Sequence, residues 1–203
     1  MKLLHIDSSI QGEASASRAL THAITARWKE THPHAQVIYR DLVAHELPHL
    51  SHGALSGANE VEAARGATVL EEFLSADVVV LGAPMYNFGL ASQLKAWIDR
   101  ITVAGKTFRY GAQGPEGLAG GKQVIIAVSR GGVYPPGSPA EFAESYLKFL
   151  FGFLGVKDVT FVRAEGLALS PQHREAALQA AHASITRPGA RSSHANATDA
   201  SDA

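Results

Sequence analysis

The chain contains no cysteine, no strong excess of charge of either sign and no long apolar run. Without cysteine there are no disulfides, thiolate metal sites or iron–sulfur clusters, so any redox role needs a bound cofactor. A net charge of −1 without a basic stripe argues against nucleic-acid binding, which requires clustered Lys and Arg. No run approaches the roughly 20 apolar residues that span a bilayer. The stretch after Met1 is also too short for a signal peptide. These absences predict a soluble cytoplasmic protein with no nucleic-acid or membrane partner.

Apolar runs rich in β-forming residues alternate with helical patterns along the chain. Strands are predicted at 3–6, 36–40, 78–82, 124–128 and 158–163, and helices at 16–30, 59–74, 92–101, 141–154 and from 171 to before 188. Right-handed crossovers then give a three-layer α/β domain with a doubly wound, parallel, five-stranded sheet. Periodicity alone leaves the strand order open between a Rossmann-like and a flavodoxin-like sheet.

The length of 203 residues and the apolar content of 46% predict one domain, over residues 1–187. Residues 41–57 are polar and rich in His, Pro and Ser, and are predicted to form a long loop. Residues 102–121 are Gly-rich and aromatic, and are predicted to be irregular. The small, polar residues of 188–203 predict a disordered tail.

Three loops each follow one of the predicted buried strands. They contain Ser8, Ser9 and Ser15–Arg18 after the first strand, Pro84–Phe88 after the third, and Ser129–Gly132 after the fourth. The carboxyl ends of parallel strands open at the same edge of a sheet, and ligands of open α/β sheets bind there. The sequence therefore predicts one composite pocket built from three loops.

The first loop has the character of a phosphate site. A dinucleotide-binding site needs several glycines after the first strand, whereas only Gly12 occurs here. The loop offers serine hydroxyls instead and leads into a helix whose free N–H groups and dipole favour an anion. Arg18 is expected to add positive charge. This chemistry suits a terminal monophosphate and points to FMN. The alternative is that Ser15 or Ser17 only caps the helix.

The second and third loops have features that suit a flat heteroaromatic ring. Met85, Tyr86 and Phe88 can supply apolar surface, and the backbone amides near Asn87 and Phe88 can reach the polar rim of such a ring. In the third loop, Gly131 and Gly132 allow close approach of the backbone, because neither has a Cβ. The alternatives are a small satellite core for the second loop and an ordinary turn for the third.

Across these loops the chain resembles the FMN-dependent NADH azoreductases, also described as NADH:quinone reductases. The resemblance runs from Met1 to about Arg187. It is carried by Ser15–Arg18, Pro84–Phe88, Ser92–Lys95, Ala104–Tyr110, Gly114–Leu118 and Ser129–Gly132. It implies a flavodoxin-like fold with strand order 2-1-3-4-5, non-covalent FMN in each subunit, and a homodimer with active sites at its interface.

By position, the resemblance places particular residues against the cofactor. Ser9, Ser15, Ala16 and Ser17 are expected at the phosphate. The flavin ring is expected beside Met85, Tyr86, Asn87 and Phe88 and beside Ser129, Arg130, Gly131 and Gly132. The implied activity is a ping-pong transfer of hydride from NADH, through flavin N5, to quinones and aromatic azo compounds. The flavin carries this chemistry, so no catalytic side chain is predicted.

Aromatic side chains in the irregular segment are candidates for a substrate-facing wall. Phe108 or Tyr110 is expected to reach the flavin face, with the neighbouring subunit as one source, and ordinary packing under a loop is the alternative. Arg109 or Lys106 could accept a 2′-phosphate, so use of NADPH stays open beside NADH.

Other readings of the chain remain. A flavodoxin-type electron carrier without NADH oxidation is the main alternative, although such carriers are usually strongly acidic and this chain is nearly neutral. A regulatory protein that kept the fold without flavin is another. No metal site is predicted. His45, His49 and His52 have helical spacing but fall in a polar segment interrupted by Pro48, which makes helical alignment doubtful.

Overall fold

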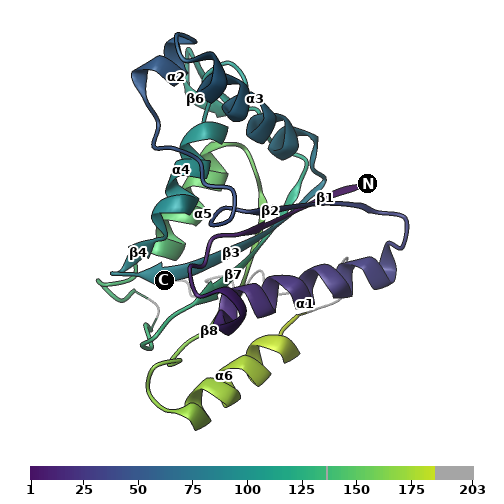
Figure 1. Ribbon diagram of the computed structural model, residues 1–203, viewed down its shortest axis with the longest axis vertical. Coiled ribbons are helices and arrows are strands. Elements are labelled where there is room, and N and C mark those ends of the chain that lie inside the picture. Colours follow the sequence, from purple (N-terminus) through teal and green to yellow (C-terminus); the bar gives the residue numbers. More distant parts are fainter. Residues whose placement is uncertain (136, 186–203) are drawn as a thin grey trace, which may run out of the picture.

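A twisted parallel sheet lies at the centre of the computed structural model, which describes residues 1–135 and 137–185. Its strands are β1 (Lys2–Asp7), β2 (Gln36–Asp41), β3 (Val78–Tyr86), β7 (Gln123–Ser129) and β8 (Asp158–Ala164). They pair in the order β2-β1-β3-β7-β8 (Figure 1). Counted along the chain, this order is 2-1-3-4-5, which confirms the predicted doubly wound α/β fold.

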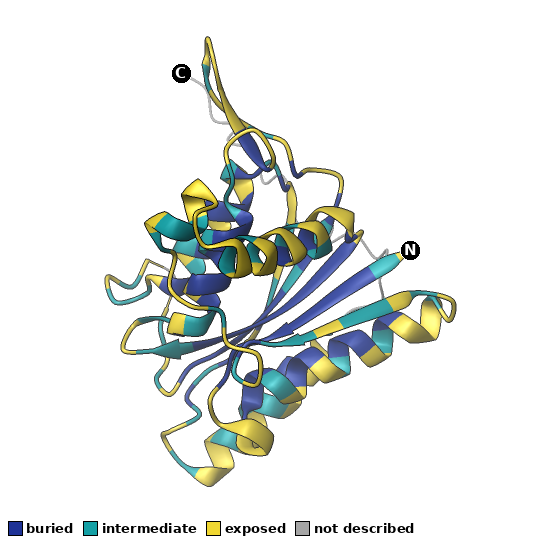
Figure 2. Cartoon of the chain, turned by 45° about the horizontal axis from the view of Figure 1, so that its top comes forward, coloured by how far each residue is buried: buried dark blue, intermediate teal, exposed yellow. Residues whose placement is uncertain are grey.

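Helices cover both faces of the sheet and bury a separate core on each (Figure 1). On one face lie α1 (Ala16–Thr31) and α6 (Pro171–Ala183). On the other lie α3 (Glu60–Ser75), α4 (Ser92–Ile101) and α5 (Ala143–Phe153). Successive side chains of β1 point to opposite faces, so Leu3 packs under α1 and Leu4 under α3 and α4. Figure 2 shows the buried strands between these exposed outer helix surfaces.

Local sequence signals explain where several elements begin. β3 is buried from Val78 to Pro84, as expected for a strand covered on both faces. Asn59 caps α3 by accepting a hydrogen bond from the Glu62 amide. Ser170 caps α6 in the same way, with Pro171 in the first turn, where its missing N–H costs nothing. The predicted boundaries of these helices are confirmed to within one or two residues, and α6 ends at Ala183, before Pro188 as predicted.

Two segments hold more regular structure than predicted. The loop at 41–57 contains a short helix, α2 (His52–Ser56), which Ser51 caps and Gly57 ends with a positive φ of 77°. The segment at 102–121 contains a hairpin of β5 (Phe108–Gly111) and β6 (Gly114–Gly117). Gly117 of this hairpin packs directly on the backbone at Gly155, where there is no room for a side chain: a Cβ on Gly117 would lie 2.1 Å from the Gly155 nitrogen. A short strand, β4 (Gly89–Leu90), also pairs antiparallel to β3.

In the described part of the chain, no helix has both the length and the apolar character needed to cross a bilayer. The expectation of a disordered tail at 188–203 lies outside the described residues. The extent of a single domain to residue 187 stays a prediction.

Candidate functional site

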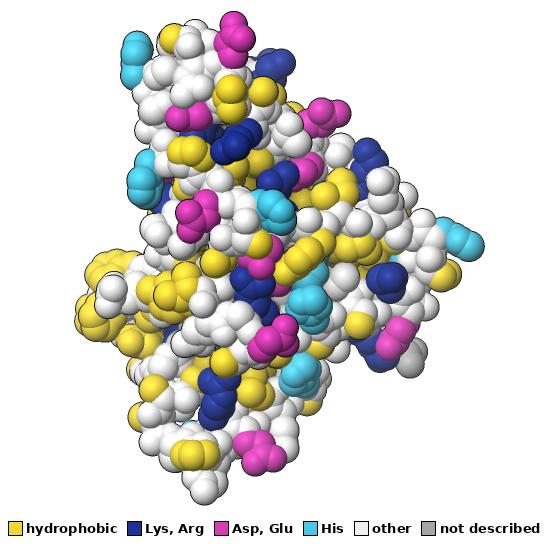
Figure 3. Space-filling view, in the orientation of Figure 1, with side chains coloured by type: hydrophobic (Ala, Val, Ile, Leu, Met, Phe, Trp, Pro, Cys, Tyr) yellow, Lys and Arg dark blue, Asp and Glu magenta, His cyan; other side chains and the backbone are white. Residues whose placement is uncertain are grey.

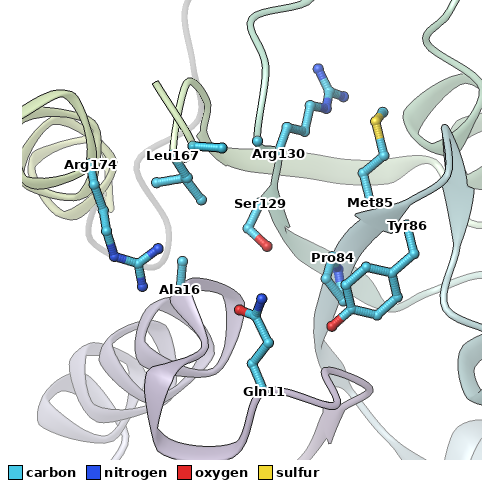
Figure 4. A pocket seen from close by; sticks show the side chains of 11 residues that line it. Gln11, Ala16, Pro84, Met85, Tyr86, Ser129, Arg130, Leu167 and Arg174 are labelled. Carbon is cyan, nitrogen blue, oxygen red and sulfur yellow. The ribbon is translucent and has the colours of Figure 1, made fainter. Parts of the chain in front are cut away.

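A pocket opens at the carboxyl edge of the sheet, and four chain segments surround it (Figure 4). Three of them are the predicted loops, which contribute Ala16, Pro84–Tyr86 and Ser129–Gly131. The fourth follows β8 and contributes Leu167, Ala168 and Arg174. The strand order reverses between β1 and β3, and the pocket lies at this switch point, where ligands of doubly wound sheets bind. The composite pocket predicted from the sequence is therefore present.

The start of α1 offers N–H donors to the pocket. Ser15 caps the helix by accepting a hydrogen bond from the Arg18 amide, which is the alternative left open for this serine. Among the described residues, the amides of Ala16 and Ser17 have no hydrogen-bond acceptor. Ala16 lines the pocket, so a bound anion would meet unsatisfied donors at the positive end of the helix dipole.

The serine hydroxyls of the first loop make contacts within the protein. Ser17 is fully buried, and its Oγ lies 3.2 Å from Ser15 Oγ. Ser8 Oγ donates to the Gly82 carbonyl, and Ser9 Oγ lies 3.1 Å from the Tyr86 hydroxyl. These contacts join the first loop to β3 and stiffen the phosphate-site candidate. A hydroxyl would have to rotate before it could donate to a ligand.

Arg18 does not supply charge to the pocket, contrary to the expectation from the sequence. Its guanidinium donates to both carboxylate oxygens of Asp41, at 2.7 and 2.8 Å, and to the Ser9 carbonyl at 2.9 and 3.1 Å. The hydrogen bond and charge of Arg18 lower the pKa of Asp41 from 3.8 to about 2. Arg18 thus fixes the first loop from behind through the end of β2.

Arg174, and not Arg18, brings positive charge to the pocket. It lies on α6, lines the pocket, and donates to the Ala14 carbonyl at 2.8 Å. Figure 4 shows its guanidinium directed toward Ala16. Arg174 was not among the predicted site residues, because these came only from the loops after the first, third and fourth strands. The last strand ends at the same edge, so the segment that follows it was a detectable candidate.

The second loop is a tight turn with an unusual backbone. Asn87 and Phe88 join β3 to β4 and have positive φ values of 48° and 66°. A two-residue hairpin turn with two positive φ values favours Asn and Gly, so Phe88 is strained by about 1–2 kcal/mol. Strain of this size persists where the surroundings enforce it, commonly at ligand sites. The turn directly follows Met85 and Tyr86, which line the pocket, whereas Asn87 and Phe88 are not among the lining residues, so their place at the flavin rim stays a prediction.

The third loop places the backbone of Ser129–Gly131 in the pocket and turns one side chain away. The Ser129 hydroxyl points inward in Figure 4, whereas Arg130 extends out of the pocket. Arg130 is buried and donates to Glu141, Glu144 and Glu165 at 2.8–3.0 Å. Its guanidinium anchors the loop. Among the described residues, the amides of Gly131 and Gly132 have no acceptor, and Gly131 lines the pocket.

The two aromatic wall candidates lie away from this pocket. Phe108 is buried against Phe153, with ring centroids 4.8 Å apart, as the packing alternative expected. Tyr110 is 76% exposed on the same hairpin. This hairpin packs against the end of α5, and neither Phe108 nor Tyr110 is among the residues that line the pocket. Neither side chain contributes to the pocket of its own chain.

Comparison with known proteins identifies the family to which this fold belongs. The family model described as "Flavodoxin-like fold" matches residues 1–187. The chain belongs to this family. It is 56% identical over 185 residues to the FMN-dependent NADH:quinone oxidoreductase of Xanthomonas oryzae pv. oryzae (strain MAFF 311018), covering 91% of this chain and 95% of that protein. The counterpart of the same name in Stenotrophomonas maltophilia (strain K279a) is 53% identical, covering 91% and 94%.

Two solved structures share the fold closely. An azoreductase of Bacillus anthracis str. Sterne superposes with a TM-score of 0.83 at 32% identity, covering 91% of this chain and 96% of that chain. An FMN-dependent NADH-azoreductase of Bacillus anthracis str. Ames Ancestor, solved in complex with FMN, has a TM-score of 0.80 at 26% identity, covering 91% and 95%. The resemblance stated from the motifs is confirmed.

The pocket of this family member has the donor set that FMN requires. A monophosphate needs N–H donors and positive charge, which the start of α1 and Arg174 provide. The pyrimidine edge of a flavin needs further N–H donors, which Gly131 and Gly132 hold free of other acceptors among the described residues. The cavity is open to solvent and has a volume of about 150 Å³. Ligand pockets commonly span about 300–1,000 Å³, so a flavin would extend beyond this one.

Proposed function

We propose that this chain is an FMN-dependent oxidoreductase that transfers hydride from NADH to quinones and aromatic azo compounds. The observation that carries the proposal is the pocket at the β1/β3 switch point, where amides without other acceptors meet one cation. Its relatives at more than half identity are FMN-dependent NADH:quinone oxidoreductases, and its structural neighbours include FMN-dependent NADH-azoreductases.

The phosphate of FMN is proposed to bind at the start of α1. The amides of Ala16 and Ser17 would donate to it, and Arg174 would add positive charge. The hydroxyls of Ser15 and Ser17 contact each other in the same loop, and the Ser9 hydroxyl contacts that of Tyr86. Rotation of these hydroxyls toward the phosphate would add further donors.

The isoalloxazine ring is proposed to lie between the second and third loops. Met85, Tyr86 and Phe88 would cover its apolar body, with the Asn87 and Phe88 amides at one rim. The segment Ser129–Gly132 would meet the pyrimidine end, with Arg130 acting through its backbone. When bound, FMN supplies the hydride chemistry between the two substrates. The loops would hold the ring and would leave one face open, so that NADH and the acceptor would use the same place in turn.

The substrate-binding face is proposed to be completed by a second copy of this chain. Phe142, which directly precedes α5, and Phe149 within it are 60% and 74% exposed. They are seven residues apart, about two helical turns, and so lie on the same side of the helix. Phe88 and Val133, next to the pocket, are also exposed. Figure 3 shows hydrophobic side chains gathered at the edge where β4 lies in Figure 1. Large apolar patches of this kind mark protein interfaces, and the proposed assembly is a homodimer.

The partner's hairpin would then supply the aromatic wall. Tyr110 is too far from its own pocket but is exposed and free to meet a neighbour, and Phe108 supports it edge-on at 5.6 Å. Steady-state kinetics of Tyr110→Ala with quinone and azo substrates should show a raised KM, while Leu55→Ala, exposed on α2, should behave as wild type. Unchanged kinetics in Tyr110→Ala and in Phe108→Ala would remove the hairpin from the site. Because NADH is a cytoplasmic reductant, we also propose that the protein is cytoplasmic.

An anaerobic experiment separates this function from electron carriage. NADH added to the FMN-loaded protein should bleach the visible flavin absorption, and a quinone added afterwards should restore it, with no other protein present. An electron carrier would keep its absorption when NADH is added. A chain that stays colourless after incubation with FMN would contradict the proposal at its first step.

A further inference from the structure

Three side chains of metal-ligating type converge beneath α1, outside the cofactor pocket. His5 and Asp7 are two residues apart on β1 and therefore point to the same face of the sheet, and His22 reaches them from α1. Asp7 Oδ2 lies 3.4 Å from His5 Nε2 and 3.8 Å from His22 Nε2. Their potential ligand atoms all lie within 4.8 Å of one another. Among the described residues, no other group of three His, Cys, Asp or Glu side chains is arranged in this way.

One ring nitrogen of the buried His5 makes no hydrogen bond. Its Nδ1 lies 3.3 Å from Thr25 Oγ1, and donation from Nδ1–H to this hydroxyl leaves the lone pair on Nε2. His5 is only 3% exposed, and its Nε2 has no hydrogen-bond partner among the described residues. Buried polar atoms are nearly always satisfied, so an unpartnered nitrogen facing a carboxylate and a second imidazole needs an explanation.

Two hydrogen bonds orient the Asp7 carboxylate. Thr21 donates to Oδ1 at 2.7 Å and Tyr39 donates to Oδ2 at 3.0 Å. Asp7 is also fully buried, so these two hydrogen bonds fix the direction in which its carboxylate points. Metal-binding carboxylates and imidazoles are commonly fixed by such outer hydrogen bonds.

The surrounding charge also permits a cation. Arg18 lies 3.9 Å from Asp7 Oδ2, but its guanidinium is paired with both oxygens of Asp41. With neutral imidazoles, the two carboxylates and one guanidinium sum to −1, so the cluster carries an excess negative charge. Since the His22 side chain is 64% exposed, an ion can enter from solvent.

We propose that His5 Nε2, Asp7 Oδ2 and His22 Nε2 bind a divalent transition metal of the zinc class. Zinc takes imidazole nitrogen and carboxylate oxygen at about 2.0–2.2 Å with tetrahedral geometry, which puts neighbouring ligand atoms about 3.3–3.4 Å apart. The observed separations of 3.4 and 3.8 Å are close to this value. The fourth position faces solvent at His22 and would hold water. The ion would tie β1 to α1 directly behind the first loop, independently of FMN.

The test is calorimetric titration of Zn²⁺ into the FMN-loaded, tag-free chain after removal of metals. One ion should bind per chain. His22→Gln should weaken this binding at least tenfold while leaving the circular dichroism spectrum unchanged, because His22 is largely exposed. The chain has 10 histidines, so the control is a double variant, His45→Gln with His49→Gln. It removes two exposed imidazoles outside the site and should bind Zn²⁺ like wild type.

X-ray absorption at the zinc edge provides a second, independent readout. The wild-type complex should show two imidazole nitrogens and at least one oxygen at about 2.0–2.2 Å. Absence of saturable binding, equal binding by wild type and His22→Gln, or loss of binding in the His45 and His49 double variant would each overturn the proposal. In that case the three residues form only an electrostatic cluster that supports the sheet.

Discussion

The Arg18–Asp41 ion pair behind the first loop leads to a quantitative prediction. Asp41→Asn keeps the size of the side chain and can keep its hydrogen bonds from the Val43 and Ala44 amides, but it removes the negative charge. Each pKa unit corresponds to about 1.36 kcal/mol, so the fall in the pKa of Asp41 from 3.8 to about 2 corresponds to about 2 kcal/mol of folding free energy. We expect the variant to lose about this much stability at pH 7.

The sign of the pH dependence follows from the direction of the pKa change. The pKa of Asp41 is lower in the folded state than in the unfolded chain, so its contribution is complete above about pH 4 and disappears as the pH falls toward 2. The stability difference between wild type and Asp41→Asn should therefore be constant near neutral pH and shrink between pH 4 and 2. Urea denaturation of the FMN-free proteins, followed by circular dichroism at several pH values, measures this difference.

A matched control separates this pair from ordinary surface charge. Lys95 and Asp99 form an ion pair of 2.6 Å along α4, but their side chains are 50% and 30% exposed. Exposed pairs contribute about 0–1 kcal/mol, so Asp99→Asn should cost well under half as much as Asp41→Asn. The reasoning is refuted if the two variants lose equal stability, or if the cost of Asp41→Asn persists undiminished at pH 2.

Three further predictions concern the pocket, the sheet and the assembly. Arg174→Ala should weaken FMN binding about tenfold, or about 1.4 kcal/mol, in a fluorescence titration. Arg27→Ala, at the far end of α1, is the control and should bind FMN like wild type. Equal FMN affinities of Arg174→Ala and wild type would contradict the phosphate role of Arg174. Gly82→Ala should destabilise the protein by about 1–3 kcal/mol, because the new Cβ would lie 3.0 Å from Asp7 Oδ1. Gly152→Ala in α5 should stabilise the protein by up to about 1 kcal/mol, because no atom lies within 4 Å of the new Cβ and alanine favours a helix. Thermal melts in which both variants shift the melting temperature in the same direction would disprove this. Phe149→Glu should convert the proposed homodimer to monomer in light scattering and reduce quinone turnover at least tenfold. A variant that stays dimeric would place the interface elsewhere.

The sequence predicted the sheet well because its strands carry strong local signals. The apolar run at Val78–Leu81 is typical of a strand covered on both faces, and its position before a turn places the second loop at the carboxyl edge. Asn59 and Pro171 mark helix starts through local hydrogen bonding and local φ restriction. Such features depend on neighbours within a few residues.

The parts that the sequence analysis missed depend on contacts between distant residues. Arg18 and Arg174 are equally basic in the sequence, and only folding shows that Asp41 binds the first while the second lines the pocket. Likewise, nothing local shows that His5, Asp7 and His22 converge, because α1 must first pack on β1. The hairpin in the irregular segment depends on the contact of Gly117 with Gly155, which lies far along the chain.

A crystal structure of the FMN complex of this chain tests the central claim most directly. The phosphate should lie at the amides of Ala16 and Ser17 with Arg174 beside it, and the ring should lie between the turn at Asn87–Phe88 and the amides of Gly131 and Gly132. A phosphate bound at another edge of the sheet, or a ring outside these loops, would contradict the account.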